Sequence, residues 1–145
     1  MANADSLSQQ TGEVISNYRI GVAKGVTLNT VQNGLVTIPL LGGGLTNGGA
    51  AGNSGGVIVR RVTVQNPNGS LASAYISVGT SNGGATIVAN SILSSITSNA
   101  TFQDMTTTAT YVAGSTTQCL YVNVNVVAGN ANTCDIVVWG DVVKF

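Results

Sequence analysis

The sequence predicts an all-β protein, with one antiparallel β-sandwich domain that resembles a jelly roll. Short β-favouring segments recur at near-regular spacing and are separated by turns rich in Gly and Asn. No stretch carries the apolar periodicity of a long helix. The chain has 145 residues, which suits one domain able to bury roughly 70% of the surface of its unfolded chain.

The sandwich domain is expected over residues 14–145, behind a polar N-terminal arm at residues 1–13. The segment lacks periodicity, so we interpret it either as a frayed terminus or as an arm that becomes ordered against a partner. It has no basic start followed by an apolar run, and no secretory signal is therefore expected. The apolar stretches are far shorter than the ~20 residues that span a bilayer.

The strands are predicted from β-favouring runs bounded by turn residues. They are expected at residues 18–23, 26–31, 35–41, 57–65, 74–80, 101–108, 118–127 and 133–143, with shorter segments that could include a helical turn at 86–89 and 92–96. Pro39 limits its run to a sheet edge or a strand end.

Turns are predicted at Asn33-Gly34, 66–69, 81–84 and 128–132. The Gly-rich segment Gly42–Gly56 is expected to be a surface loop. A phosphate-binding loop is disfavoured there because no G-x-G-x-x-G register fits, no Lys-Ser/Thr follows, and the next element is a strand.

The last two strands are the clearest pair and are expected to form a hairpin. Their apolar faces match in a register that sets Cys134 opposite Val126 and Cys119 opposite Asp141. The two cysteines would then lie roughly 25 Å apart, whereas a disulfide requires Cα atoms about 4.4–6.8 Å apart. We therefore predict two free thiols, with Cys134 filling the core.

Arg60 and Arg61 are adjacent in the run VIVRRVTVQ, although the whole chain has only five Lys and Arg. Alternation would place Arg60 on the face of Val62 and Arg61 on the face of Val59, so at least one guanidinium leaves an apolar row. One interpretation is an ion pair with Asp135 or Asp141. The other is that one arginine reaches across a contact between subunits.

Catalytic chemistry is not indicated. The chain has no His, which excludes histidine triads and histidine metal sites. Asp135 and Asp141 would lie roughly 20 Å apart on one strand, and no calcium-loop motif is present. We expect neither an enzyme nor a cofactor or metal site.

The charge composition points towards protein contacts. Five Lys+Arg balance five Asp+Glu, and charged residues make up 7% of the chain. That balance gives no footprint for nucleic acid or an anionic membrane. A surface of Asn, Ser, Thr and Gly suits a protein packed against neighbours, or alternatively a stable domain with a neutral polar coat.

Two aromatic residues of the predicted hairpin are candidate interface residues. Trp139 and Tyr121 would share its outward face and form a stacking platform for a sugar or a base. The alternative is a cross-strand pair or an anchor in a protein interface.

The order VIVRRVTVQNPNGSLASAYISVGTSNGGATIVANSILSS, followed by CLYVNVNVVAGNANTCDIVVWGDVV, resembles the small jelly-roll decoration (cement) proteins of tailed-phage capsids. The shared features are a strand ending in a turn, a strand of short side chains with a Gly-rich turn, a later long hairpin, and a final strand with Gly-Asp-Val. The similarity covers residues 57–143.

The resemblance implies a homotrimer that binds the major capsid protein on the outside of the virion and reinforces the shell, after synthesis in the host cytoplasm. Arg60, Arg61, Trp139 and Tyr121 are the candidate interface residues. Two other classes remain open: a receptor- or carbohydrate-binding module of a virion fibre or surface assembly, and a self-assembling coat subunit.

Overall fold

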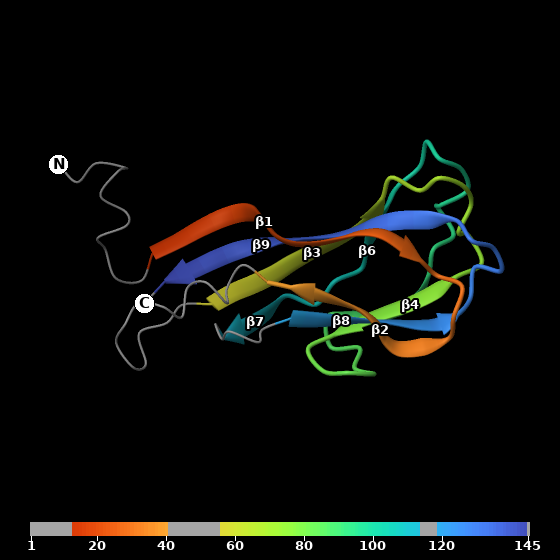
Figure 1. Cartoon of the computed structure of the whole chain (residues 1–145). Coiled ribbons are helices and arrows are strands. Elements are labelled where there is room, and N and C mark those ends of the chain that lie inside the picture. The colour runs from red at the N-terminus through yellow and green to blue at the C-terminus, as the bar shows by residue number, and fades with distance from the viewer. Residues whose placement is uncertain (1–12, 41–55, 114–118, 145) are drawn as a thin grey trace.

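The computed structural model describes residues 13–40, 56–113 and 119–144. These residues form two antiparallel sheets packed against each other, which confirms the predicted all-β sandwich (Figure 1). The strands are β1 (Glu13–Thr27), β2 (Gln32–Pro39), β3 (Gly56–Gln65), β4 (Tyr75–Gly79), β5 (Val88–Ile92), β6 (Gln103–Met105), β7 (Thr110–Ala113), β8 (Cys119–Val126) and β9 (Thr133–Lys144).

Strands near the two ends of the chain pair with each other, and strands from the middle of the chain pair with each other. Sheet A has the order β1-β9-β3-β6, with β7 also paired to β3, and sheet B has the order β2-β8-β4-β5. The first strand thus pairs with the last, the second with the next to last, β3 with β6 and β7, and β4 with β5. This rolled-up arrangement of two sheets is that of a jelly roll.

The predicted hairpin between residues 118–127 and 133–143 is wrong, although both strands exist. Strand β8 lies in sheet B between β2 and β4, and β9 lies in sheet A between β1 and β3. The connection between them therefore crosses from one sheet to the other, as Figure 1 shows. The predicted register is therefore also wrong. Cys134 pairs with Val26 instead of Val126, and Cys119 pairs with Pro39 instead of Asp141.

Other boundaries differ where the local signal was ambiguous. The run 18–23 and the first two residues of the run 26–31 belong to one bulged strand, β1, which ends at Thr27. Asn33-Gly34 lies inside β2 at a register shift instead of forming a turn. The segments 86–89 and 92–96 contain one strand, β5, and of 101–108 only Gln103–Met105 is a strand. Strand β7 was not predicted.

The core lies between the sheets and is supplied by alternate residues of both. Fully buried side chains include Val57, Val59, Val62 and Val64 from β3, and Leu120 and Val122 from β8. Each contributes about 1.5–3 kcal/mol by its removal from water. Pro39 ends β2, an edge strand, as predicted.

The described residues contain no helix, and none therefore that could cross a membrane. The expected arm and the expected Gly-rich loop lie outside the described residues, except that Glu13 begins β1 and Gly56 begins β3.

Candidate functional site

Arg60 is the extra residue of a β-bulge in β3. Val59 pairs with Gly140 of β9 and Arg61 pairs with Trp139, so Arg60 has no partner of its own in that ladder. The inward positions change from Val57 and Val59 to Val62 and Val64 on passing the bulge. Both arginine side chains are consequently about half exposed, at 53% and 47%. The prediction that the two arginines point to opposite faces is wrong. The bulge adds one residue to β3, so the adjacent residues Arg60 and Arg61 both project from the outer face.

Gly140 makes room for this bulge. A Cβ atom at this position would collide with the carbonyl oxygen of Ile58 on β3. Gly140 also pairs with Tyr18 of β1, and β1 has register shifts on both sides of the Tyr18–Arg19 segment. Both strands that flank β9, β1 on one side and β3 on the other, are therefore irregular at the same point of β9.

Arg60 forms the ion pair that the sequence suggested. Its Nε donates a hydrogen bond of 2.9 Å to Oδ2 of Asp141, whose side chain is only 12% exposed. Asp135, the other predicted partner, accepts hydrogen bonds from the backbone N of Gly25 and from Nδ2 of Asn66, each 2.9 Å long. The guanidinium thus covers a nearly buried carboxylate and still reaches the surface.

Arg61 lies over the only tryptophan of the chain. Its guanidinium carbon is 5.1 Å from the centroid of the Trp139 ring, within the range of a cation–π interaction. Its Nε is 3.7 Å from Oδ1 of Asp104, which also accepts a 2.5 Å hydrogen bond from Oγ1 of Thr63. The indole Nε1 of Trp139 is buried and has no hydrogen-bond partner within the described part of the chain.

Arg19 belongs to the same row, although sequence reasoning did not single it out. It is exposed and pairs across the sheet with Trp139, on the side opposite to Arg61. Directly paired residues project from the same face of a sheet. The outer face of sheet A therefore carries the row Arg19–Trp139–Arg61, which the pairing of β1 with β9 creates and which no local signal predicts.

The predicted platform of Trp139 and Tyr121 is not formed. Tyr121 lies on β8 in sheet B, and Trp139 lies on β9 in sheet A. The neighbouring Cys119 thiol raises the pKa of Tyr121, chiefly through a side-chain hydrogen bond. Because Arg60, Arg61 and Trp139 all lie in sheet A, Tyr121 is separated from the three other candidate residues.

Both cysteines are free, as predicted, but for a different reason than the hairpin register. They lie in different sheets, with Cys119 half-buried and Cys134 1% exposed in the core. Burial, with a smaller contribution from the charge of Asp135, raises the pKa of Cys134 to about 12.

The charged residues that the structure describes are confined to one sheet. In the described part of the chain, all Asp, Glu, Lys and Arg residues lie on β1, β3, β6 and β9, which are strands of sheet A. They are Glu13, Arg19, Lys24, Arg60, Arg61, Asp104, Asp135, Asp141 and Lys144. Sheet B and the described connecting segments have none.

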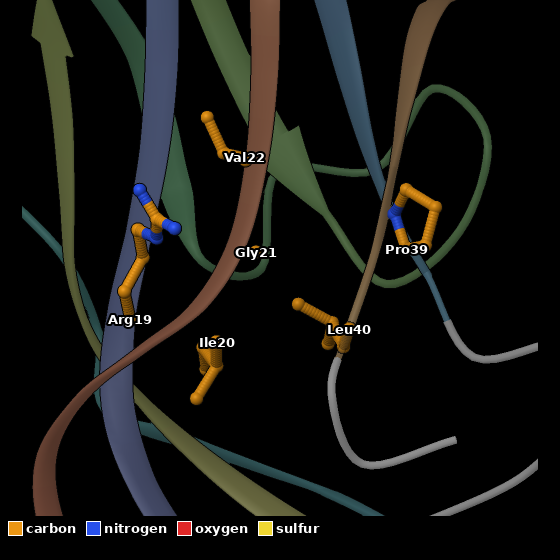
Figure 2. Close-up of a pocket in the computed structure, with 6 residues that line it drawn as sticks. All are labelled: Arg19, Ile20, Gly21, Val22, Pro39 and Leu40. Atoms are coloured by element: carbon orange, nitrogen blue, oxygen red, sulfur yellow. The ribbon is translucent and has the colours of Figure 1, made fainter. Parts of the chain in front are cut away.

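A shallow pocket of about 400 Å³ lies where the edge strands of the two sheets meet. Figure 2 shows its lining: Arg19, Ile20, Gly21 and Val22 from β1 on one side, and Pro39 and Leu40 on the other. A Cβ atom on Gly21 would lie 2.8 Å from Cγ2 of Ile38, so the missing side chain lets the two edges approach. Arg19 is the single ionisable residue in the lining of this pocket. We interpret the pocket as a gap in the packing between the two edge strands and not as a binding site.

A second pocket, of about 330 Å³, is polar and lies at the end of β3. Its lining includes the amide side chains of Gln65, Asn66 and Asn99 and the 63% exposed ring of Phe102. Across residues 13–40, 56–113 and 119–144, no group of three or more His, Cys, Asp or Glu could hold a metal ion.

No family model, curated protein or solved structure matches this chain.

Proposed function

We propose that this chain is a structural virion protein that binds the outside of an assembled tailed-phage capsid and stabilises the shell, with the major capsid protein as its partner. The observation that carries the proposal is the row Arg19–Trp139–Arg61 on the outer face of sheet A. Arginine and tryptophan are the residue types enriched at the energetic centres of protein interfaces. The resemblance over residues 57–143 supplies the class of partner.

The charge pattern of this face favours a protein partner over nucleic acid. Arg60 is paired with Asp141, and Arg61 lies near Asp104. The cations are thus interleaved with carboxylates, whereas a phosphate backbone attracts a continuous basic stripe. The exposed edges of the guanidinium groups are free to bind carboxylates or carbonyls of a neighbouring protein.

In this proposal the protein acts as a homotrimer on the virion surface, after synthesis in the host cytoplasm, and it is neither an enzyme nor a membrane protein. Repeated attachment over many copies converts a modest affinity at each contact into a large stabilisation of the shell. The jelly roll is compatible with such a role because viral capsid domains use this architecture.

The test is co-sedimentation of the purified protein with undecorated heads of the same virus. Wild type is expected to sediment with the heads, and Arg61→Ala to bind at least about 10-fold more weakly, since central arginine contacts are commonly worth more than 1 kcal/mol. The matched control is Lys24→Ala, which removes an exposed positive charge near the C-terminal end of β1, outside the row Arg19–Trp139–Arg61. Equal binding of all three proteins, or no binding by wild type, would contradict the proposal.

The N-terminal arm is proposed to add to this attachment. Deletion of residues 1–12, which ends just before β1, is expected to weaken head binding and to leave the unfolding midpoint unchanged. Unchanged head occupancy would remove this role for the arm.

A second candidate, a carbohydrate-binding module, is favoured by the polar pocket at Phe102. Neutral sugars offer hydroxyl groups to amide side chains and an apolar face to an aromatic ring, and this pocket provides both around Gln65, Asn66 and Phe102. Lectin domains also use the jelly roll. Binding on a glycan array that Phe102→Ala abolishes, but Val31→Ala at another exposed apolar residue preserves, would support it.

A further inference from the structure

The outer face of sheet B differs from that of sheet A in having no charged residue. Strands β2, β4, β5 and β8 carry only apolar, hydroxyl, amide and thiol side chains. A freely exposed face of a soluble protein usually carries charges of both signs. The segregation of charge on sheet A therefore marks sheet B as the face better suited to being covered.

Part of that outer face is already covered by the chain itself. Asn123 of β8 is fully buried, and its Oδ1 accepts hydrogen bonds from the backbone N of Gly34 and of Gly83. Its Nδ2 donates to the carbonyl of Gly84 and to Oγ of Ser77. The turn after β4 is thereby held across β8 and against β2, and it closes this half of the face.

The other half of the face presents an apolar row that nothing in the described chain covers. Tyr75 of β4 pairs with Val126 of β8 on one side and with Ile92 of β5 on the other. Val126 is 45% exposed and Ile92 is 37% exposed. A bulge at Asn125, which lies between the paired residues Val124 and Val126, turns Val126 outwards.

The polar neighbours of this row are held in place. Nδ2 of Asn125 donates to Oδ1 of Asn90 at 2.9 Å and to Oγ of Ser77 at 3.2 Å. This cross-strand pair of Asn125 and Asn90 therefore borders the apolar row, with little side-chain entropy left to lose on association.

The open edge of β5 is blocked at the same end. Nε2 of Gln103 donates to the carbonyl of Ile92, and its Oε1 accepts from the backbone N of Ser95. Addition of a partner strand at this position of the edge would have to break these bonds. A partner is therefore favoured on the face of sheet B and disfavoured along its β5 edge.

We infer that the apolar row Tyr75–Ile92–Val126 is the surface through which copies of this chain associate with one another. Around the three-fold axis of a cyclic trimer each residue lies near its own copies, so a charged face such as that of sheet A would place like charges near each other at the axis. The face of sheet B avoids this cost because it has no charges, and its apolar row supplies area to bury. The inference names the contact within the proposed homotrimer and leaves sheet A free for the shell.

The experiment is sedimentation equilibrium of the full chain without capsids, for wild type, Ile92→Lys and Val126→Lys. Wild type is expected to be trimeric, and each lysine variant to dissociate at least about 100-fold more readily, because the new charge would be buried without a partner. Lys24→Glu, a charge change at an exposed residue of β1 in sheet A, is the control and is expected to remain trimeric. Trp139 fluorescence and the thermal midpoint verify that each variant is folded.

The inference is overturned if wild type is a monomer, or if folded Ile92→Lys and Val126→Lys remain trimeric. It is also overturned if both lysine variants keep the wild-type oligomeric state and lose head binding, because sheet B would then face the shell. Trimers that dissociate in the lysine variants, combined with wild type that does not bind heads, would leave this inference standing and remove the proposed function alone.

Discussion

Nε of Arg60 and Oδ2 of Asp141 lie 2.9 Å apart, although the two residues are 81 positions apart in the chain. The bulge in β3 makes the contact possible by projecting Arg60 from the outer face, and the pairing of Ile58 with Asp141 brings the carboxylate beside it. The arginine is half exposed and the aspartate nearly buried. The pair therefore contributes both to the stability of sheet A and to the chemistry of its surface.

Arg60→Ala is expected to lower the free energy of unfolding by about 1 kcal/mol, the range of a charged hydrogen bond that is partly screened by solvent. Urea denaturation followed by Trp139 fluorescence measures it. A double-mutant cycle with Asp141→Asn should give a coupling of about 0.5–1 kcal/mol. Additive effects of the two substitutions would show that the contact is not energetically coupled.

Gly140→Ala should prevent folding or lower the free energy of unfolding by at least about 3 kcal/mol. The new methyl group would collide with the carbonyl oxygen of Ile58, and a backbone atom cannot move aside as the end of a flexible side chain can. Gly129→Ala is the comparison. Gly129 has open space around it and a φ of 78°, so only the backbone conformation is strained, at about 1 kcal/mol. Thermal unfolding of both variants measures the difference, and equal costs would contradict the close approach.

Asn123→Ala should lower the free energy of unfolding by about 2–4 kcal/mol, because it leaves the backbone groups of Gly34, Gly83 and Gly84 without the amide that binds them. Asn125→Ala, at an exposed position two residues along β8, should cost less than about 1 kcal/mol. Chemical denaturation distinguishes the two. Similar small losses would mean that water replaces the buried amide at no cost.

Stability should fall at alkaline pH through Cys134. Its folded pKa of about 12 lies above the ordinary value of 9.0, so the unfolded chain releases this proton first as the pH rises. The thiol's contribution is complete below pH 9 and declines up to about pH 12, by about 1.4 kcal/mol per pH unit for one proton. The difference in unfolding free energy between wild type and Cys134→Ala should therefore shrink between pH 8 and 11. A constant difference would contradict the raised pKa.

Local features of this protein follow from the sequence alone. Alternation with a period of two predicts that Leu120, Val122, Val124 and Val126 share the apolar face of β8. The first three are buried, as predicted, whereas Val126 is 45% exposed. The same alternation places Cys134 in the core. The strand that contains Arg60 and Arg61 is predicted from its β-favouring residues, and the turn after it from Asn66, Pro67 and Gly69. The scarcity of carboxylates also limited the partners of Arg60 to a short set, which included Asp141.

Only the tertiary structure decided which strands pair and which residues meet. Alternation states which side of a strand is apolar but not which strand lies beside it, so β8 and β9 looked like a hairpin and lie in different sheets. A bulge adds one residue without a compositional signal, and it changed the orientation of Arg60 and of Val126. The row Arg19–Trp139–Arg61, the burial of Asn123 and the charge-free face of sheet B all arise from contacts between distant segments, whose energies depend on the packed sandwich as a whole.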